Sequence, residues 1–319
     1  MCWCSESTSS PRRCWGHRRA DRHICCGLKR IQWFYGRRNC MENLWKERFR
    51  LLTSPFRMLP SFIIPGETKC GTTTFFRCLE RHPLIASPDM KEPNNFIRYG
   101  GTSPFCRMHY PLFFQKIFNR RIITGEASVE YLSKRDTAVA VHSLIPDVKL
   151  IILLRNPIRR AFSDFLMMKD AGREPEDFDA VVKTAIAWLN DGSLDRLIRV
   201  ATTVDDTPLR YLTKGCYSKT IDSWLKTFPR HNIRIIKSER FFLEPQKVLD
   251  ETFEFLGIGP FTVDSVPHHR KARLKVPLKI ETVQMLDDFF APYTMELKRK
   301  IGSEFSWEED TAELLESCI

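Results

Sequence analysis

Residues 60–75 constrain the fold of this chain more than any other stretch. The apolar residues 62–64 predict a short strand, and a turn with two glycines, Gly66 and Gly71, follows it before a helical pattern begins. Glycines let a turn point its N–H groups inward, and a helix N-terminus adds partial positive charge and free N–H donors. The stretch therefore predicts a strand–loop–helix unit that binds an anionic group such as a phosphate.

The loop differs from the Walker A loop of nucleotide-hydrolysing enzymes, which reads G-x-x-x-x-G-K-[ST]. The two glycines have the Walker separation, but Thr72 stands where the lysine belongs, and Lys69 lies two residues before the second glycine. We therefore expect an anion site at which ATP or GTP hydrolysis is disfavoured. An ordinary glycine-containing turn between a strand and a helix is the alternative that this segment alone leaves open.

A second segment of the same kind lies further along the chain. Residues 148–154 form a continuous apolar run, which is typical of a strand buried in a parallel sheet. Arg155 follows this strand, Pro157 suits the first turn of a helix, and Ser163 lies two turns into that helix. Because ligands of open α/β sheets bind beyond the carboxyl ends of the strands, this arginine and serine can bind a second phosphate. A surface arginine and an unrelated helix serine are the alternative.

Together, the two loops resemble those of the sulfotransferases that use 3′-phosphoadenosine 5′-phosphosulfate (PAPS) as the sulfuryl donor. The loop of that family that binds the 5′-phosphosulfate carries a lysine, a glycine and Thr/Ser residues. Its 3′-phosphate site reads Arg-x-Pro, with a serine eight residues after the arginine, as in this chain. The match is closest to the carbohydrate branch, which modifies heparan or chondroitin chains. The resemblance implies that the donor is bound by Lys69, Cys70, Gly71, Thr72, Thr73 and Thr74 at its 5′-phosphosulfate, and by Arg155 and Ser163 at its 3′-phosphate.

Three weaker segments occur in the order found in that family, so the resemblance covers about residues 60–303. Glu92 belongs to a Lys-Glu-Pro-Asn-Asn-Phe run that is similar to the family's Lys-Glu-x-His-x-Phe segment. Tyr217 ends a Lys-Gly-Cys-Tyr run that is similar to the family's Gly-x-Tyr helix, which implies a contact with the cofactor. A basic run before the last long helix resembles a loop that closes over the nucleotide: Arg270, Lys271, Ala272 and Arg273.

The resemblance also implies two catalytic residues. Lys69 would neutralise the charge that develops as the phosphate leaves, and Glu92 would take the proton of an acceptor hydroxyl. Asn94 stands where the family has histidine, so Glu92 would act without a partner that shuttles protons. A solvated loop lysine at position 69 and an ion pair of Glu92 with Lys91 or Arg98 are the alternatives. We expect no metal, because the lysine and the helix dipole supply the positive charge.

Strands that alternate with helices predict an α/β fold, a three-layer, doubly wound parallel sheet with a P-loop-like phosphosulfate-binding loop. Besides the two strands above, we expect strands near 122–128 and at 233–236, and helices at 134–145, 157–170, 176–190, 217–228, 245–256 and 279–300. We expect three parts: a basic, Cys/Arg-rich leader at 1–45, a sulfotransferase domain at 58–305 and a C-terminal tail at 306–319.

The formal net charge of +11 raises the possibility of a nucleic-acid partner. Most of this charge falls in residues 1–40, which hold nine basic residues against two acidic ones, and the chain contains none of the standard nucleic-acid-binding motifs. Six of the eleven cysteines fall there too, in a spacing that fits no standard zinc site. We therefore expect neither a nucleic-acid partner nor a bound metal.

The acceptor and the compartment are less constrained. The resemblance implies a carbohydrate hydroxyl as acceptor, with residues 84–110 and 191–213 as the segments that contact it. It also implies the Golgi lumen. A cytoplasmic location is the alternative, because no run approaches about 18 apolar residues and the later cysteines show no disulfide framework. Two other functions stay open: a P-loop-type nucleotide kinase or nucleotidase, and a non-catalytic relative that binds nucleotides or glycans.

Overall fold

The computed structural model describes residues 50–116, 119–134, 136–191, 208–266 and 276–316. Contacts between residues divide the chain into two units, Met1–Arg50 and Leu51–Ile319. Every helix and strand named below belongs to the second unit. The predicted basic loop at Lys271, Ala272 and Arg273 lies outside the described residues, as do residues 192–207 of the expected acceptor segment.

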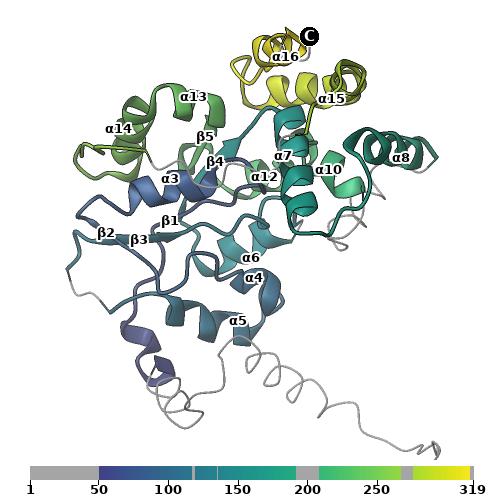
Figure 1. Cartoon of the computed structure of the whole chain (residues 1–319). Helices are drawn as coiled ribbons and strands as arrows, with labels where there is room; N and C mark the ends of the chain where they lie inside the picture. Colours follow the sequence, from purple (N-terminus) through teal and green to yellow (C-terminus); the bar gives the residue numbers. More distant parts are fainter. Residues whose placement is uncertain (1–49, 117–118, 135, 192–207, 267–275, 317–319) are drawn as a thin grey trace, which may run out of the picture. The chain divides into compact units, whose positions relative to one another are not determined.

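A five-stranded parallel sheet in the order β2-β3-β1-β4-β5 forms the centre of this unit (Figure 1). Its strands are β1 (Phe62–Ile63), β2 (Ile85–Ala86), β3 (Ile123–Glu126), β4 (Lys149–Leu154) and β5 (Ile233–Lys237). The first strand lies in the middle, with β3 on one side and β4 on the other. This order brings the loop after β1 beside the loop after β4, at the edge where open α/β sheets bind ligands.

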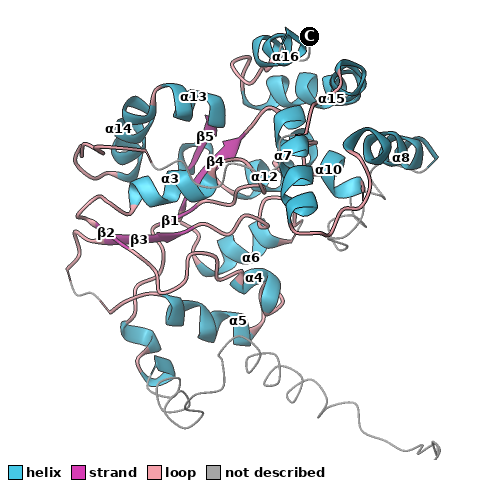
Figure 2. Cartoon of the chain, viewed as in Figure 1, coloured by secondary structure: helices cyan, strands magenta, loops and turns pink. Residues whose placement is uncertain are grey.

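Helices cover both faces of the sheet, which confirms the predicted α/β class (Figure 2). On one face lie α3 (Thr72–Leu79), α13 (Ser238–Leu243) and α14 (Pro245–Leu256), and on the other lie α6 (Thr137–Leu144) and α12 (Asp222–Thr227). The rings of Phe75 and Phe241 join α3 to α13, with their centroids 5.0 Å apart. The remaining helices are α4 (Asn95–Arg98), α5 (Pro104–His109), α7 (Pro157–Asp170), α8 (Phe178–Asp191), α10 (Leu209–Thr213), α11 (Tyr217–Thr220), α15 (Ile280–Ile301) and α16 (Glu308–Glu316), with 3₁₀ turns at Ser54–Phe56, Tyr110–Phe113 and Arg230–Asn232.

Two apolar clusters form the core. The larger one surrounds the sheet, where residues 150–154 of β4 are fully buried, and the smaller one lies among α7, α8, α10 and α15. Burying one large aliphatic side chain contributes about 1.5–3 kcal/mol, so the buried strand is a major source of stability. In the described part of the chain, no helix combines the length and the apolar character that crossing a membrane requires.

The segment after residue 305, expected as a tail, contains helix α16 and contacts both α13 and the loop after β4. Trp307 is buried, and its indole N–H donates to Glu239 at 3.1 Å. Asn156 donates through its side-chain amide to the Thr311 hydroxyl at 3.1 Å. These contacts attach the C-terminal helix to the edge of the sheet at which the two predicted phosphate loops meet.

Candidate active site

The loop between β1 and α3 has an unusual backbone. Lys69 and Gly71 both have positive φ angles, of 71° and 81°. Glycine adopts this conformation freely, but a lysine does so at a cost of about 1 kcal/mol, which other contacts of the loop must offset. A Cβ atom added at Gly66 would lie only 2.3 Å from Cγ2 of Thr72, so this position also requires glycine. The glycines of the pattern are therefore needed for the shape of the loop.

Helix α3 begins at Thr72 and points its N-terminus at this loop. Its N-cap residue is Gly71, which has no side chain to accept a hydrogen bond from the first N–H groups of the helix. The first turn holds three threonines and no acidic residue. Unsatisfied N–H groups, hydroxyls and the positive end of the helix dipole are the features that bind a phosphate or sulfate group. The residues present thus fit the 5′ anionic group that the sequence predicts here.

The second predicted loop contacts the first. Arg155 follows β4, and its guanidinium donates through Nη1 to the backbone oxygen of Lys69 at 3.0 Å. The next residue, Asn156, caps α7, because its side-chain oxygen accepts from the N–H groups of Ile158 and Arg159 at 2.9 and 3.1 Å. Ser163 lies in the middle of α7 and is half-buried. The structure thereby brings together the two loops that the sequence pattern singled out.

Tyr217 contacts both loops. Its side chain is 1% exposed, and its hydroxyl donates to the backbone oxygen of Arg155 at 2.9 Å and lies 3.5 Å from Sγ of Cys70. Ser238, which the sequence did not single out, donates through its hydroxyl to the backbone oxygen of Cys70 at 2.6 Å. Both residues therefore bind the loops themselves in this structure. A contact between Tyr217 and the cofactor stays a prediction.

Glu92 lies next to the start of α3. The ammonium group of Lys91 forms an ion pair with Glu92 and donates to the Thr73 hydroxyl at 2.9 Å. The carboxylate of Glu92 is 37% exposed, which leaves it accessible to an incoming substrate. The ion pair with Lys91, one of the two alternatives considered from the sequence, is thus present. It attaches the Glu92 segment to the first phosphate loop.

Comparison with known proteins decides the family. A model of the sulfotransferase domain matches residues 59–277, which include both loops, Glu92 and Tyr217. The chain belongs to the sulfotransferase family.

Individual relatives agree with this result at low sequence identity. Carbohydrate sulfotransferase 15 of Rattus norvegicus is 26% identical over 84% of this chain and 57% of its own length. Human heparan sulfate glucosamine 3-O-sulfotransferase 3A1 is 24% identical over 81% of this chain and 64% of its own length. The chain therefore spans 57% and 64% of the lengths of these two relatives. The crystal structure of a sulfotransferase from Alicyclobacillus acidocaldarius matches 76% of this chain and 96% of that chain, with a TM-score of 0.56 and 27% identity.

A buried carboxyl group supports the Glu92 segment of this family member. Glu126, at the end of β3, is fully buried and accepts hydrogen bonds from the Tyr110 hydroxyl at 2.6 Å and from the Ser128 hydroxyl. The Ser128 oxygen in turn accepts from the backbone N–H of Asn94 at 3.3 Å. Burial raises the pKa of Glu126 to about 7 despite these hydrogen bonds, and the nearby charge of Glu92 adds to the rise.

A second buried carboxyl group belongs to the first loop. Glu67 is fully buried and accepts from the backbone N–H of Thr68 at 3.2 Å, while Nζ of Lys214 lies 3.9 Å from its carboxylate. Burial raises the pKa of Glu67, and the positive charges of Lys214 and Arg160 oppose the rise. Sequence reasoning missed both buried glutamates, because an isolated acidic residue is usually exposed and only the fold shows which ones are buried.

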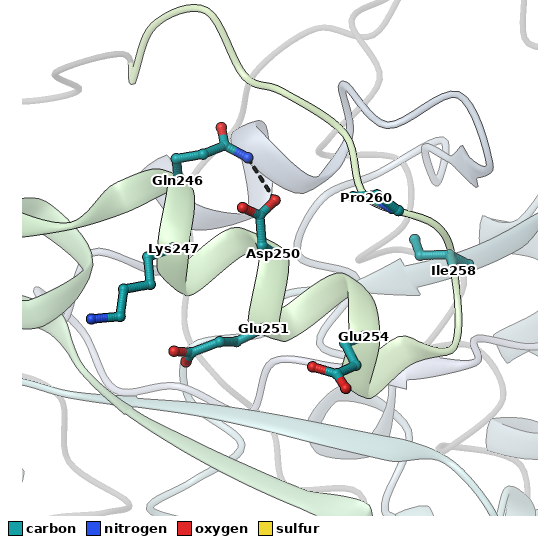
Figure 3. Close-up of a pocket in the computed structure, with 7 residues that line it drawn as sticks. All are labelled: Gln246, Lys247, Asp250, Glu251, Glu254, Ile258 and Pro260. Carbon is teal, nitrogen blue, oxygen red and sulfur yellow. Dashed lines mark hydrogen bonds between the residues drawn. The ribbon is translucent and has the colours of Figure 1, made fainter.

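A pocket beside α14 is unsuited to the donor (Figure 3). It is lined by Gln246, Lys247, Asp250, Glu251, Glu254, Ile258 and Pro260. Three carboxylates against one lysine would repel a ligand that carries phosphates. Among the residues that the structure describes, no group of three or more His, Cys, Asp or Glu side chains is arranged to hold a metal ion.

Proposed function

We propose that this member of the sulfotransferase family transfers a sulfuryl group from PAPS to a hydroxyl group of a carbohydrate. The observation that carries the proposal is the contact between the two loops, in which the Arg155 guanidinium binds the backbone of Lys69 at 3.0 Å. One loop leads into a helix N-terminus without a side-chain cap, and the other begins with an arginine, so the pair offers two neighbouring anion sites. PAPS has two anionic groups, at its 5′ and 3′ positions, that such a pair can bind.

In the proposed reaction, the acceptor oxygen attacks the sulfur in line with the bond to the departing phosphate oxygen. An oxygen–sulfur bond to the acceptor forms, the sulfur–oxygen bond to the phosphate breaks, and 3′-phosphoadenosine 5′-phosphate (PAP) leaves. As in phosphoryl transfer, positioning and charge stabilisation supply most of the acceleration. Lys69 and the N-terminus of α3 would stabilise the negative charge on the leaving oxygen.

Glu92 is the proposed general base. Its carboxylate is accessible, and Lys91 holds it near Thr73, beside the proposed 5′-phosphosulfate site. An acceptor hydroxyl placed between this carboxylate and the sulfuryl group would lose its proton to Glu92 as the new bond forms. Asn94 adopts a left-handed backbone conformation with a φ of 49°, and it would act as a hydrogen-bonding residue in place of the histidine found in the family.

The names of the relatives support the acceptor class, since one is a carbohydrate sulfotransferase and the other a heparan sulfate sulfotransferase. The Golgi lumen, which the family resemblance implies, is the proposed compartment. Lys271, Ala272 and Arg273 remain proposed contacts of the nucleotide on the basis of the family resemblance alone.

Transfer of radioactive sulfur from labelled PAPS to a panel of glycosaminoglycan chains tests the proposed function. We expect labelled carbohydrate with the unmodified chain, and a loss of at least about a hundredfold in rate for Lys69→Ala and for Glu92→Gln, because each removes a group that acts in the transition state. Lys247→Ala is the matched control, because Lys247 lies on α14 and forms an ion pair with Glu244. A Lys69→Ala variant that keeps the full rate would contradict the assignment, and phosphate transfer from ATP without sulfate transfer would favour a kinase.

A further inference from the structure

We propose that Tyr217 is a positioning residue that couples the two phosphate-binding loops through its single buried hydroxyl group. The inference rests on the proposed function, since it assumes that each loop binds one anionic group of the donor. It assigns Tyr217 a role that needs no contact with the donor, because the hydroxyl is used by the protein on both sides.

The hydroxyl of Tyr217 bridges the loops by two hydrogen bonds. Its proton goes to the backbone oxygen of Arg155 at 2.9 Å, so the contact with Cys70 at 3.5 Å must be donated by the thiol. Burial raises the pKa of Cys70 to about 11, and the thiol therefore keeps the proton that it donates at neutral pH. A chain of donors thus runs from Cys70 in the first loop through Tyr217 to Arg155 in the second.

A further hydrogen bond closes this chain into a ring. The Arg155 side chain donates to the backbone oxygen of Lys69, the residue that precedes Cys70 in the chain. The two loops are therefore joined twice, once by the guanidinium and once through Tyr217. Neither loop can move relative to the other without breaking at least one of these contacts.

These contacts can hold the first loop in a backbone conformation that is strained. Lys69 has a φ of 71°, which a lysine adopts only when its surroundings favour it. The ribose and its rotatable bonds allow the two anionic groups of one donor molecule only a limited range of separations, so loops held within that range before binding match the donor. A site that is organised in advance avoids spending binding energy on ordering the loops.

Ser238 provides an internal comparison. Its hydroxyl binds the backbone oxygen of Cys70 at 2.6 Å and so holds only the first loop. Removal of this hydroxyl should weaken the 5′ site alone, whereas removal of the Tyr217 hydroxyl should weaken the cooperation between the two sites. The two residues therefore separate support of one loop from coupling of both.

The test is calorimetric titration of the full chain with PAP, adenosine 5′-phosphate and adenosine 3′-phosphate. For Tyr217→Phe we expect PAP affinity to fall about three- to tenfold, the effect of one hydrogen bond, with a smaller loss for either monophosphate. For Ser238→Ala we expect losses for PAP and the 5′-phosphate but not for the 3′-phosphate. Tyr211→Phe is the matched control and should bind PAP as the unmodified chain does, because Tyr211 is equally buried and its hydroxyl binds Glu174 at 3.0 Å instead.

The outcomes separate this inference from the proposed function. Unchanged PAP binding by Tyr217→Phe, or an equal loss for all three ligands, overturns the coupling role while leaving the donor site intact. Failure of the unmodified chain to bind PAP overturns the proposed function and the inference with it. If Tyr217→Phe does not fold, Cys70→Ala removes the other end of the bridge, and it must show the same selective loss for PAP.

Discussion

At the scale of single residues, the buried carboxyl group of Glu126 has the most direct chemical consequence. Burial raises its pKa to about 7, above the ordinary value of 4.5. Tyr110, Ser128 and Tyr131 surround it with hydroxyl groups, and the charge of Glu92 lies nearby. The protein therefore contains a carboxyl group that titrates near neutral pH next to the segment that carries the proposed general base.

This raised pKa predicts how the stability of the protein depends on pH. Between pH 4.5 and about 7 the folded protein keeps a proton on Glu126 that the unfolded chain has already lost. The contribution of Glu126 to stability is therefore complete below pH 4.5 and is lost as the pH rises through about 7, by about 3 kcal/mol in all. Glu126→Gln removes this titration. We expect its free energy of unfolding, relative to that of the unmodified chain, to rise by about that amount between pH 5 and pH 8.

Urea unfolding at the two pH values measures this change. Glu254→Gln, on the exposed side of α14, controls for the loss of one negative charge. A difference between Glu126→Gln and the unmodified chain that does not vary with pH would show that the buried carboxyl group is not protonated near neutrality.

The sequence predicts some of these residues better than others. The two glycines could be recognised because they stand between a strand and a helix, Lys69 because it is a cation between them, and Arg155 because it follows a strand that is apolar throughout. Glu67 and Glu126 could not, because their burial depends on packing that no local pattern records. The position of the Tyr217 hydroxyl was equally hidden, since the sequence places this tyrosine near the site but does not show where its hydroxyl points.

At the scale of elements, the loop between β1 and α3 depends on a close approach at Gly66. A Cβ atom there would lie 2.3 Å from Cγ2 of Thr72, in the first turn of α3. Gly66→Ala should therefore displace the start of the helix. We expect a loss of about 1–3 kcal/mol in the free energy of unfolding, from overpacking, together with weaker PAP binding.

Gly259→Ala is the matched control, because a Cβ atom at Gly259 meets no other atom within 4 Å. Adding Thr72→Ser to Gly66→Ala removes the clashing methyl group but keeps the hydroxyl, and it should restore part of the lost affinity. If Gly66→Ala has the same free energy of unfolding and the same PAP affinity as Gly259→Ala, the loop does not need a glycine at this position.

The sequence predicts best those helices whose first and last residues are marked by proline or glycine. The helices α7 and α14 have the predicted bounds, because a proline begins each one and Gly257 ends α14 with a φ of 77°. The helix expected at 217–228 is instead divided at Ile221 into α11 and α12. The two-residue strand β2 and the short helices α10 and α13 were missed, since such short elements are stabilised mainly by packing against the rest of the fold.

At the scale of the whole second unit, the order of the strands creates the site. With β1 between β3 and β4, the loops after β1 and β4 become neighbours although 86 residues separate Lys69 from Arg155. The alternation of strands and helices predicted a parallel sheet, but not which strands would be adjacent. The contacts of Trp307 and Asn156 also show that α16 belongs to this unit, and residues beyond 305 gave no sequence signal for that packing.

Calorimetric titration of the full chain with PAP and with ATP, each with and without Mg²⁺, tests the central claim most directly. We predict PAP binding that is unaffected by Mg²⁺, is much tighter than ATP binding, and is lost in Arg155→Ala. Arg159→Ala, which removes a neighbouring arginine that is ion-paired with Glu313, should bind PAP normally. Binding of ATP that requires Mg²⁺, with no PAP binding, would contradict the assignment of these loops to a sulfuryl donor.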